Sequence, residues 1–593
     1  MLYKIKIITA FLLIVCFSAT LFSQVTTKGI SKAVMGKTNF TEVAKYELIH
    51  PAERLAKKPE MEDEDIKTIP LPVDQSTPPF GGKLTNIDVA PGINKPAAPL
   101  EFPCVNFRAL DDNGVTDPPD VNGAIGFDHI MTTLNTQISI QTKQGGNIST
   151  TSLTGFWNGL GGHTDIFDPK ITYDPYDRRW IFVCSATRDN ANSALLLAVS
   201  ETPDPTLGWT TYTFDVDPGD QLWLDYPSLG FNRNWITVSG NLFNITGITI
   251  PNRGRIWAIS KADVYAGLPN ITAPFFERTD YFSISPANTY DANDNTQWCV
   301  SRHNPNSNNN GFVRLISITG AQAAPVFTLG AIVNTGPAWS SNSEVVGGPQ
   351  LTSAAFIDLG DDRLLQSTFR NGLLWYGHNI FLPADNPTTC AAEIVSINTL
   401  TGLSTENIRT AVDANNMTAY PSITVNRNND IFFGYTSFSA SAYPRATVSY
   451  RRSGQGFFFY YYKDGEDWYV KLVNGDNRWG DYSATFIDPE DDVTAWTIQE
   501  YSRPRVGGIT SAWGTWWAKI CPGSCTDDYF LFAPQDNLMK KFEANGTITS
   551  IAKIQINSSI KYDAGTKIIL SPGFKAARGV RFRAYIEGCG GTR

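Results

Sequence analysis

A hairpin pattern that recurs through the middle of the chain constrains the fold more than any other feature. Each copy has a turn, a short strand of alternating apolar residues, a polar turn, and a second strand that ends in aromatic or aliphatic residues. Such a pattern predicts a β-hairpin. The copies begin at Asp117, Asp168, Asp225, Ser285, Gly348, Tyr420 and Asp481. Their anchor positions, 50 to 72 residues apart, are Pro119, Pro169, Pro227, Pro286, Pro349, Pro421 and Ser483.

The spacing of these hairpins leaves room for two more strands in each repeat, and four-stranded units repeated radially make a β-propeller. Composition agrees, because 12% aromatic residues with 48 Gly, 35 Pro and only 6 Met suit strands and turns better than a helical bundle. We therefore predict an all-β protein, with a seven-bladed β-propeller over residues 106–525 and a small β-stack over 538–593. Six or eight blades remain alternatives, because the first and fifth copies are degenerate.

The start of the chain predicts its compartment. Residues 1–24 have the layout of a secretory signal peptide, with Lys4 and Lys6 before the apolar stretch Ile7–Phe22 and a small residue, Ser23, near the cleavage point. A retained membrane anchor is the alternative, but the stretch is short for a span, and no later segment has 18 uninterrupted apolar residues. We expect a protein that is secreted or held at the outer cell surface. The Pro-rich leader, 25–105, is expected to lie extended against the main domain.

The tail has a repeat of its own. Apolar residues recur every 14 positions at Ile554, Ile568 and Phe582, with glycines at Gly565 and Gly579, which predicts short stacked strands with glycine at the corners. Residues 538–593 hold 10 Lys and Arg against 3 Asp and Glu, whereas the whole chain has a net charge of −9. This basic tail could associate with acidic glycans or the outer membrane surface; the alternative is an ordinary solvated face.

The cysteines are sparse. Seven follow the signal peptide, between Cys104 and Cys589, too few for a fold built on disulfides. Cys521 and Cys525 are close enough in sequence to pair. No further Cys or His lies at the spacing of a zinc site.

Two stretches of sequence resemble known families. PPDVNGAIG (Pro118–Gly126), VSETPDPTLGW (Val199–Trp209) and RWGDYSATFIDPEDDVTAWTIQEY (Arg478–Tyr501) resemble secreted bacterial sialidase-like, or BNR-type, β-propeller proteins. YDAGTKIILSPGFKAARGVRFRAYI (Tyr562–Ile586) resembles the three-coathanger stack domain that ends secreted proteins of Bacteroidetes. The first group has no uniform activity, so the resemblance implies a fold rather than a function.

Acidic residues mark the start of several predicted inner strands, which converge on the propeller axis. The predicted metal ligands are Asp120, Asp168, Asp225 and Asp481. Converging carboxylates could bind calcium, which prefers several oxygen ligands. Alternatively, these side chains accept backbone N–H bonds and hold their turns together. No phosphate loop or dinucleotide fingerprint is present, so no organic cofactor is expected.

Aromatic and charged residues near the same starts predict a ligand site. Exposed aromatic rings stack on sugar faces, although propeller blades also pack such rings in their cores. The predicted ligand-binding residues are Trp223, Asp225, Tyr226, His378, Arg478, Trp479 and Asp481. We predict that the propeller mouth binds an extracellular polysaccharide or a cell-surface polymer. The net negative charge argues against nucleic acid.

Two other classes of function remain open, and no catalytic residue is assigned. A polysaccharide lyase needs a proton-abstracting His or Tyr, for which His163 and His378 are candidates, and a glycoside hydrolase needs two carboxylates. A sialidase would also need an arginine cluster, a role that the spacing of Arg478, Arg503 and Arg505 does not compel. The third class is an adhesion protein whose propeller binds other proteins.

Overall fold

The structure is a computed structural model that describes residues 24–25, 29–50, 78–88, 103–163, 165–473, 475–522, 529–532, 534, 539–544, 546–556 and 558–586. The predicted signal peptide lies outside these residues except for Gln24. No helix in the described ranges is long and apolar enough to cross a membrane.

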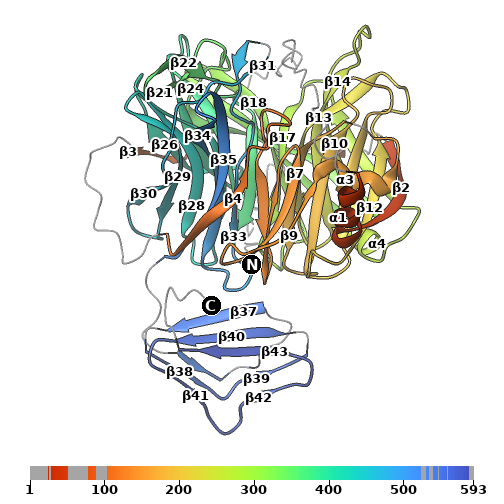
Figure 1. Ribbon diagram of the computed structural model, residues 1–593, viewed down its shortest axis with the longest axis vertical. Coiled ribbons are helices and arrows are strands. Elements are labelled where there is room, and N and C mark those ends of the chain that lie inside the picture. The colour runs from red at the N-terminus through yellow and green to blue at the C-terminus, as the bar shows by residue number, and fades with distance from the viewer. Residues whose placement is uncertain are drawn as a thin grey trace, which may run out of the picture.

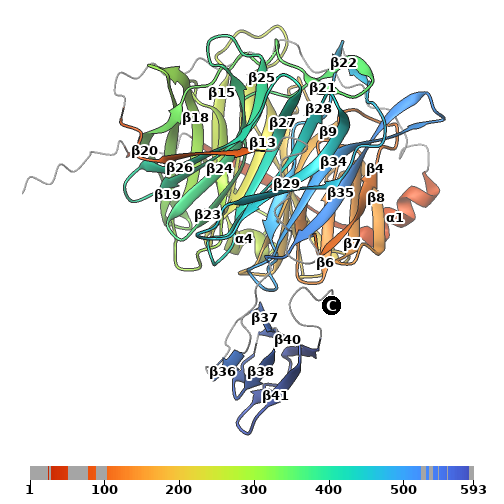
Figure 2. The same cartoon turned by 90° about the vertical axis from the view of Figure 1, so that its left-hand side faces the viewer.

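The body of the molecule consists of seven antiparallel runs of four strands, arranged about a common axis as in a β-propeller (Figures 1 and 2). In order, the runs are β5–β8 (Asn122–Ile125, His129–Thr133, Gln137–Thr142, Asn147–Ser152), β9–β12 (Ile166–Asp174, Arg179–Ala186, Ala194–Ser200, Gly208–Asp215), β13–β16 (Leu222–Phe231, Trp235–Asn244, Arg253–Ser260, Thr272–Arg278), β17–β20 (Phe282–Thr289, Gln297–Ser307, Asn310–Ala321, Ala324–Pro337), β23–β26 (Leu364–Arg370, Leu373–Leu382, Thr389–Asn398, Leu403–Ala411), β27–β30 (Asn416–Val425, Ile431–Ser439, Ala442–Arg451, Phe457–Lys463) and β33–β35 with β4 (Ala484–Ile487, Ala495–Val506, Thr510–Ile520, Val105–Asp111). The prediction of an all-β propeller is confirmed, and the number of blades stays a prediction.

One of the seven sequence anchors is misplaced. Pro349 lies in β21 (Gly348–Gln350), which pairs with β22 (Ser353–Ile357) in a separate hairpin. The inner strand of that run is β23, which begins at Leu364. The inserted hairpin has the same turn-and-strand pattern as a blade, so the sequence pattern alone cannot separate them. Another short hairpin, β31 (Leu472–Val473) with β32 (Asp476–Asn477), precedes β33.

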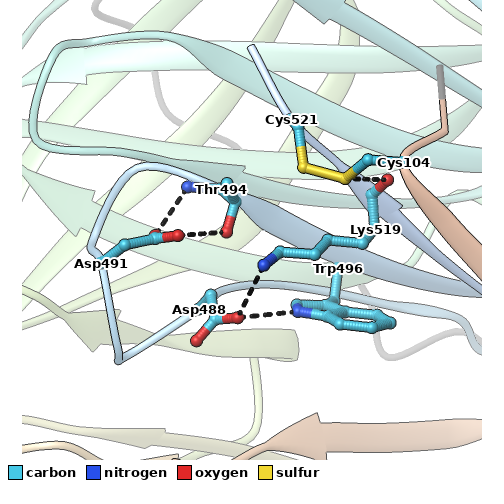
Figure 3. Close-up of a disulfide and its surroundings, with 7 residues drawn as sticks. All are labelled: Cys104, Asp488, Asp491, Thr494, Trp496, Lys519 and Cys521. Atoms are coloured by element: carbon cyan, nitrogen blue, oxygen red, sulfur yellow. Dashed lines mark hydrogen bonds and ion pairs between the residues drawn. A yellow bond between two sulfur atoms is a disulfide. The ribbon is translucent and has the colours of Figure 1, made fainter. Parts of the chain in front are cut away.

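The ring closes because a strand from the start of the chain completes the last run. β4, which precedes all seven inner strands, pairs antiparallel with β35, so that Phe107 lies opposite Trp517 (Figure 1). Cys104 and Cys521 form a disulfide beside this pairing, with a Cα–Cα distance of 6.0 Å (Figure 3). Cys521 is therefore not bonded to Cys525, a pairing that the sequence left open, and Cys525 lies outside the described residues. The sequence missed the bond because its two cysteines are 417 residues apart and only ring closure brings them together.

The leader lies against the outer edges of the propeller. β1 (Gln24–Val25) pairs with β20, and β2 (Gly29–Asn39) pairs first with β16 and then with β12. β3 (Lys83–Asp88) runs parallel to β26. Outer strands have unpaired backbone groups on one side, and these leader strands satisfy them.

Short helices fill the remaining gaps. The helix α1 (Phe40–Ile49) starts at Asn39, whose side chain accepts a bond from the N–H of Thr41, and buries Phe40 against Phe156. The other helical turns in the described residues are α3 (Leu153–Trp157), η1 (Asn158–Leu160) and α4 (Lys261–Tyr265). α1 lies against β8 and α3, at the edge of the first run.

The C-terminal domain is a coil of short parallel strands that lies below the propeller in Figure 1. Its strands are β36 (Tyr529–Leu531), β37 (Met539–Ala544), β38 (Thr547–Ser550), β39 (Lys553–Ile554), β40 (Ser559–Ala564), β41 (Lys567–Leu570), β42 (Lys575–Ala576) and β43 (Arg581–Tyr585), which form three sheets, β36–β38–β41, β37–β40–β43 and β39–β42. Lys567 lies opposite Thr547 and Lys575 opposite Lys553, so one turn of the coil takes 20 to 22 residues. The 14-residue spacing is therefore not the coil length; because the coil has three sides, that spacing marks every second side.

Candidate functional site

The inner strands begin at one end of the axial channel, here called the mouth, and four of them contain the same backbone irregularity there. Asp168, Tyr226, Ser283 and Tyr420 all have positive φ angles, between 50° and 58°, at a shift of strand register. Such a β-bulge bends a strand and redirects its side chains. Pro follows three of these four residues, and because Pro has no N–H it fits where the ladder is interrupted.

Side chains at the mouth join neighbouring runs through backbone hydrogen bonds. The N–H of Tyr226 donates to Oδ2 of Asp168 at 3.0 Å, and the N–H of Asp481 donates to Oδ1 of Asp120 at 3.0 Å. The N–H of Leu364 donates to Oγ of Ser283 at 2.7 Å. These bonds run between different runs of the ring, so they fix the mouth as one unit.

A lysine lies among the carboxylates of the mouth. Lys170 is 6% exposed and its ammonium group lies 3.0 Å from the centre of the Tyr482 ring, a cation–π contact. The charges of Asp168, Asp120 and Asp481 act on it. The protein thus has a lysine of its own close enough to these carboxylates to be affected by their charge.

Burial shifts the pKa values of this inner group. Burial raises the pKa of Asp168 to about 7, and the charges of Asp225 and Asp481 add to the rise. Burial lowers the pKa of Lys170 to about 7, although the neighbouring carboxylates oppose that change. Asp168 and Lys170 lie two residues apart on one strand, and a pKa near neutrality makes each of them a candidate for acid–base chemistry at physiological pH.

Ion pairs form the more exposed rim of the mouth. Arg478 pairs with Asp481 at 2.9 Å and with Asp358 at 3.3 Å. Arg363 pairs with Asp361 at 2.8 Å. Burial acts to lower the pKa of Arg363, but the carboxylates of Asp361 and Asp225 outweigh it and raise that pKa, so the guanidinium group keeps its charge.

The inner strands enclose a small space beside Lys170. A cavity of about 20 Å³ lies there, lined among others by Asn122, Thr172, Ser285 and Gln366. That volume is roughly the space that one water molecule needs. This cavity is therefore too small for a sugar.

The four predicted metal ligands all lie at the mouth. Two of them, Asp120 and Asp168, accept the backbone N–H bonds described above, as the structural alternative anticipated. Across the described part of the chain, no group of three or more His, Cys, Asp or Glu side chains is arranged to hold a metal ion. Calcium binding stays a prediction that a titration can test.

The predicted ligand-binding residues divide into two groups. Asp225, Tyr226, Arg478 and Asp481 meet at the mouth: Tyr226 packs on Tyr482 at 4.8 Å between ring centres, and its own side chain is buried. The remaining three lie in the core and are at most 7% exposed: Trp223, His378 and Trp479.

The buried positions of the second group have a common cause. His378 points into the interior from β24, where its Nε2 lies 2.8 Å from Oε2 of Glu393, and Trp339 packs on its ring. Trp479 packs between Phe438 and Tyr469. The sequence predicted that these side chains bind a ligand, but they are packed in the interior, as the packing alternative anticipated.

Sequence reasoning missed several residues of the mouth. Lys170 lies two positions after Asp168, and alternate residues of a strand share a face, so its place beside the carboxylates had a signal in the sequence. Arg363 and Asp358 come from the segment around β22 and β23, where the misplaced anchor hid the start of the inner strand.

Glu500 is a further acidic group close to the mouth. It lies on β34, is 2% exposed, and its Oε1 has no hydrogen-bond partner in the described part of the chain. Gly480 approaches it closely: a Cβ at that glycine would lie 3.1 Å from Oε2 of Glu500. Burial raises the pKa of Glu500 well above its usual value, and the charges of Asp117 and Asp112 add to the rise.

Comparisons with known proteins give structural similarity alone. No family model matches the sequence, and no curated protein matches it. Similar solved structures include an α-L-arabinofuranosidase of Fusarium graminearum, with 10% identity over 69% of this chain and 97% of that one, at a TM-score of 0.33. They also include an ulvan lyase bound to -[GlcA(1-4)Rha3S]-, with 10% identity, 69% and 95% coverage and a TM-score of 0.35, and a sialidase of Trypanosoma rangeli, with 8% identity, 65% and 56% coverage and a TM-score of 0.31. Similarity at this level identifies neither a ligand nor a reaction.

Proposed function

We propose that this protein is secreted and binds an extracellular polysaccharide at the mouth of its propeller. The ion-paired rim carries the proposal. The side chains of Asp225, Asp358 and Asp481 are 13%, 29% and 21% exposed, and that of Arg478 is 13% exposed. Donors and acceptors that are held in place by neighbouring charges can bond sugar hydroxyls without first being ordered.

An exposed ring lies next to this rim. Phe356 is 63% exposed and precedes Asp358 by two residues. Its carbonyl accepts a bond from the side chain of Asn477, the residue before Arg478. An aromatic face beside fixed polar groups is typical of a sugar subsite. A disulfide that joins the two ends of the ring supports secretion, because such bonds persist in oxidising compartments.

The C-terminal domain belongs to the same proposal. Its excess of Lys and Arg would retain the secreted protein at the outer surface of the cell, while the mouth stays free at the opposite end of the inner strands. β33 illustrates this separation: it begins next to Asp481 at the mouth and leads to Glu490, which pairs with Lys561 of the C-terminal domain.

The test uses purified protein with a panel of neutral and acidic polysaccharides, with and without calcium, followed by size-exclusion chromatography. We expect a polysaccharide to co-elute with the wild type and to bind Arg478→Gln at least tenfold more weakly, because that change removes both ion pairs of Arg478. Arg451→Gln is the matched control: it breaks a similar pair with Glu406 at the outer edge of the propeller. Equal binding by Arg478→Gln and wild type would contradict the proposal.

Catalysis at the same mouth is the second candidate, favoured by the pair of Asp168 and Lys170 with pKa values near 7. A lyase or hydrolase would shorten the polymer during long incubation. Products that form with wild type and disappear with Lys170→Met would assign the protein to the enzymes. Polymer that co-elutes unchanged in length would leave binding as its function.

A further inference from the structure

The three sheets of the C-terminal domain differ in what they face. The sheet β37–β40–β43 docks on the propeller. Nζ of Lys561, on β40, lies 2.5 Å from Oε1 of Glu490, and Arg581, on β43, forms an ion pair with Asp128. In Figure 1 the sheet β39–β42 lies on the side of the domain away from the propeller. Two cations of the domain are thus taken up by docking.

The other cations of the domain whose side chains the structure describes are exposed. The described exposed set is Lys553, Lys567, Lys575, Arg578 and Arg583. No ion pair joins them to a carboxylate of the described residues, and the one carboxylate among the described side chains of this domain, that of Asp563, is fully buried. Their charge is therefore available to a partner.

Strand register places two of these cations side by side. Lys553 lies directly opposite Lys575 in the parallel pair β39–β42. Neighbouring strands are about 4.8 Å apart, and like charges in that position destabilise a sheet. Arg578 follows two residues after the end of β42. The repulsion between the two ammonium groups lowers stability, and an anion that lies across both strands would reduce this repulsion.

We propose that Lys553, Lys575 and Arg578 form a binding site for a linear anionic polysaccharide bearing sulfate or carboxylate groups. The inference rests on the outer-surface association proposed above and names its chemical partner. The net charge of the whole chain is −9, so the field of the propeller repels such a polymer and leaves the C-terminal domain as the favourable place of contact.

Dextran sulfate and uncharged dextran test the proposal on the full-length protein, because the two polymers differ only in charge. We expect wild type to bind dextran sulfate and not dextran, with an affinity that falls as salt concentration rises. Lys553→Gln/Lys575→Gln is expected to weaken binding at least fivefold and to reduce the salt dependence. Its thermal midpoint is expected to equal or exceed that of wild type, because the repulsion between the two ammonium groups is gone.

Lys32→Gln/Lys45→Gln is the matched control, since it removes two exposed charges from the leader. Equal weakening by this control, or wild-type affinity in Lys553→Gln/Lys575→Gln, overturns the site. Stronger binding to anionic lipid vesicles than to dextran sulfate overturns the choice of a polysaccharide. Arg478→Gln, which removes a cation of the mouth, is expected to keep its affinity for dextran sulfate; loss there would mean that the polymer binds at the mouth, so the two proposals fail separately.

Discussion

Buried charges at the mouth show how single residues decide its chemistry. Lys170 lies among carboxylates that, from the sequence, were expected to surround a metal ion. Because the ammonium group belongs to the chain, no metal ion has to be bound there. The pKa of each carboxylate is then set by its burial as well as by the neighbouring charge. Glu500 is the extreme case, because burial and two further carboxylates both disfavour its charge.

Glu500→Gln is expected to stabilise the protein at pH 8 relative to wild type by about 1–3 kcal/mol, the usual cost of a buried group without a partner, and by less at pH 4. The folded-state pKa of Glu500 lies above its unfolded value of 4.5, so folding holds an extra proton between these values. Wild-type stability therefore falls as pH rises from 4.5 towards the folded-state pKa, whereas Gln cannot ionise and adds no such pH dependence. Urea midpoints at both pH values measure the difference. The same difference at pH 4 and pH 8 would contradict the assignment.

At the scale of elements, the main feature is that strands of the leader pair with the edge strands of the propeller. β2 passes from β16 to β12 at Ala33: Lys32 pairs with Thr272, and Ala33 pairs with Phe214. The N–H of Ala33 donates to the carbonyl of Ile271 at 3.1 Å. One strand thus joins two neighbouring runs.

Ala33→Pro is expected to release β2 from both runs, because proline cannot donate this bond and fits poorly within a ladder. Hydrogen exchange followed by mass spectrometry should show faster exchange in β12 and β16, with the inner strands unchanged. Lys45→Ala, in α1, is the control and should leave exchange in both strands as in wild type. If protection of β12 and β16 survives Ala33→Pro, β2 does not hold the two runs together.

At the scale of the whole molecule, the main feature is the closure of the ring of runs. β4 completes the last run, and the Cys104–Cys521 bond covalently fixes the strand that closes it. The nearby residues are also tied: Lys519 lies 3.6 Å from Asp488, and the indole N–H of Trp496 donates to Asp488 at 3.0 Å (Figure 3). Unfolding from the ends of the ring must break all of these contacts.

Cys104→Ser/Cys521→Ser is expected to lose about 2–5 kcal/mol of stability, the usual range for removing a native disulfide. The bond links positions 417 residues apart, so its loss frees a long loop in the unfolded chain. Urea unfolding without reductant measures the change. Wild type treated with reductant should unfold at the same midpoint as the variant; an unchanged midpoint in the variant would show that strand pairing alone closes the ring.

The repeat determined the all-β fold, because alternating apolar residues and turns recur locally and are visible along one strand at a time. It also placed Asp168, Asp225 and Asp481 at one end of the axis, since equivalent positions of a radial repeat converge. Sequence could not separate the inserted hairpin around Pro349 from a blade, or a ring that packs between blades, such as Trp479, from one that faces solvent.

The contacts between distant parts of the chain were decided only by the tertiary structure. The Cys104–Cys521 bond, the return of β4 to the last run and the pairing of Arg478 with Asp358 all depend on how the ring closes. Register in the C-terminal coil likewise set the length of its turn and brought Lys553 beside Lys575. Local sequence patterns specify where strands form. Which strands pair follows from the packing of the whole molecule, because burial and charge depend on contacts between segments that are far apart in the sequence.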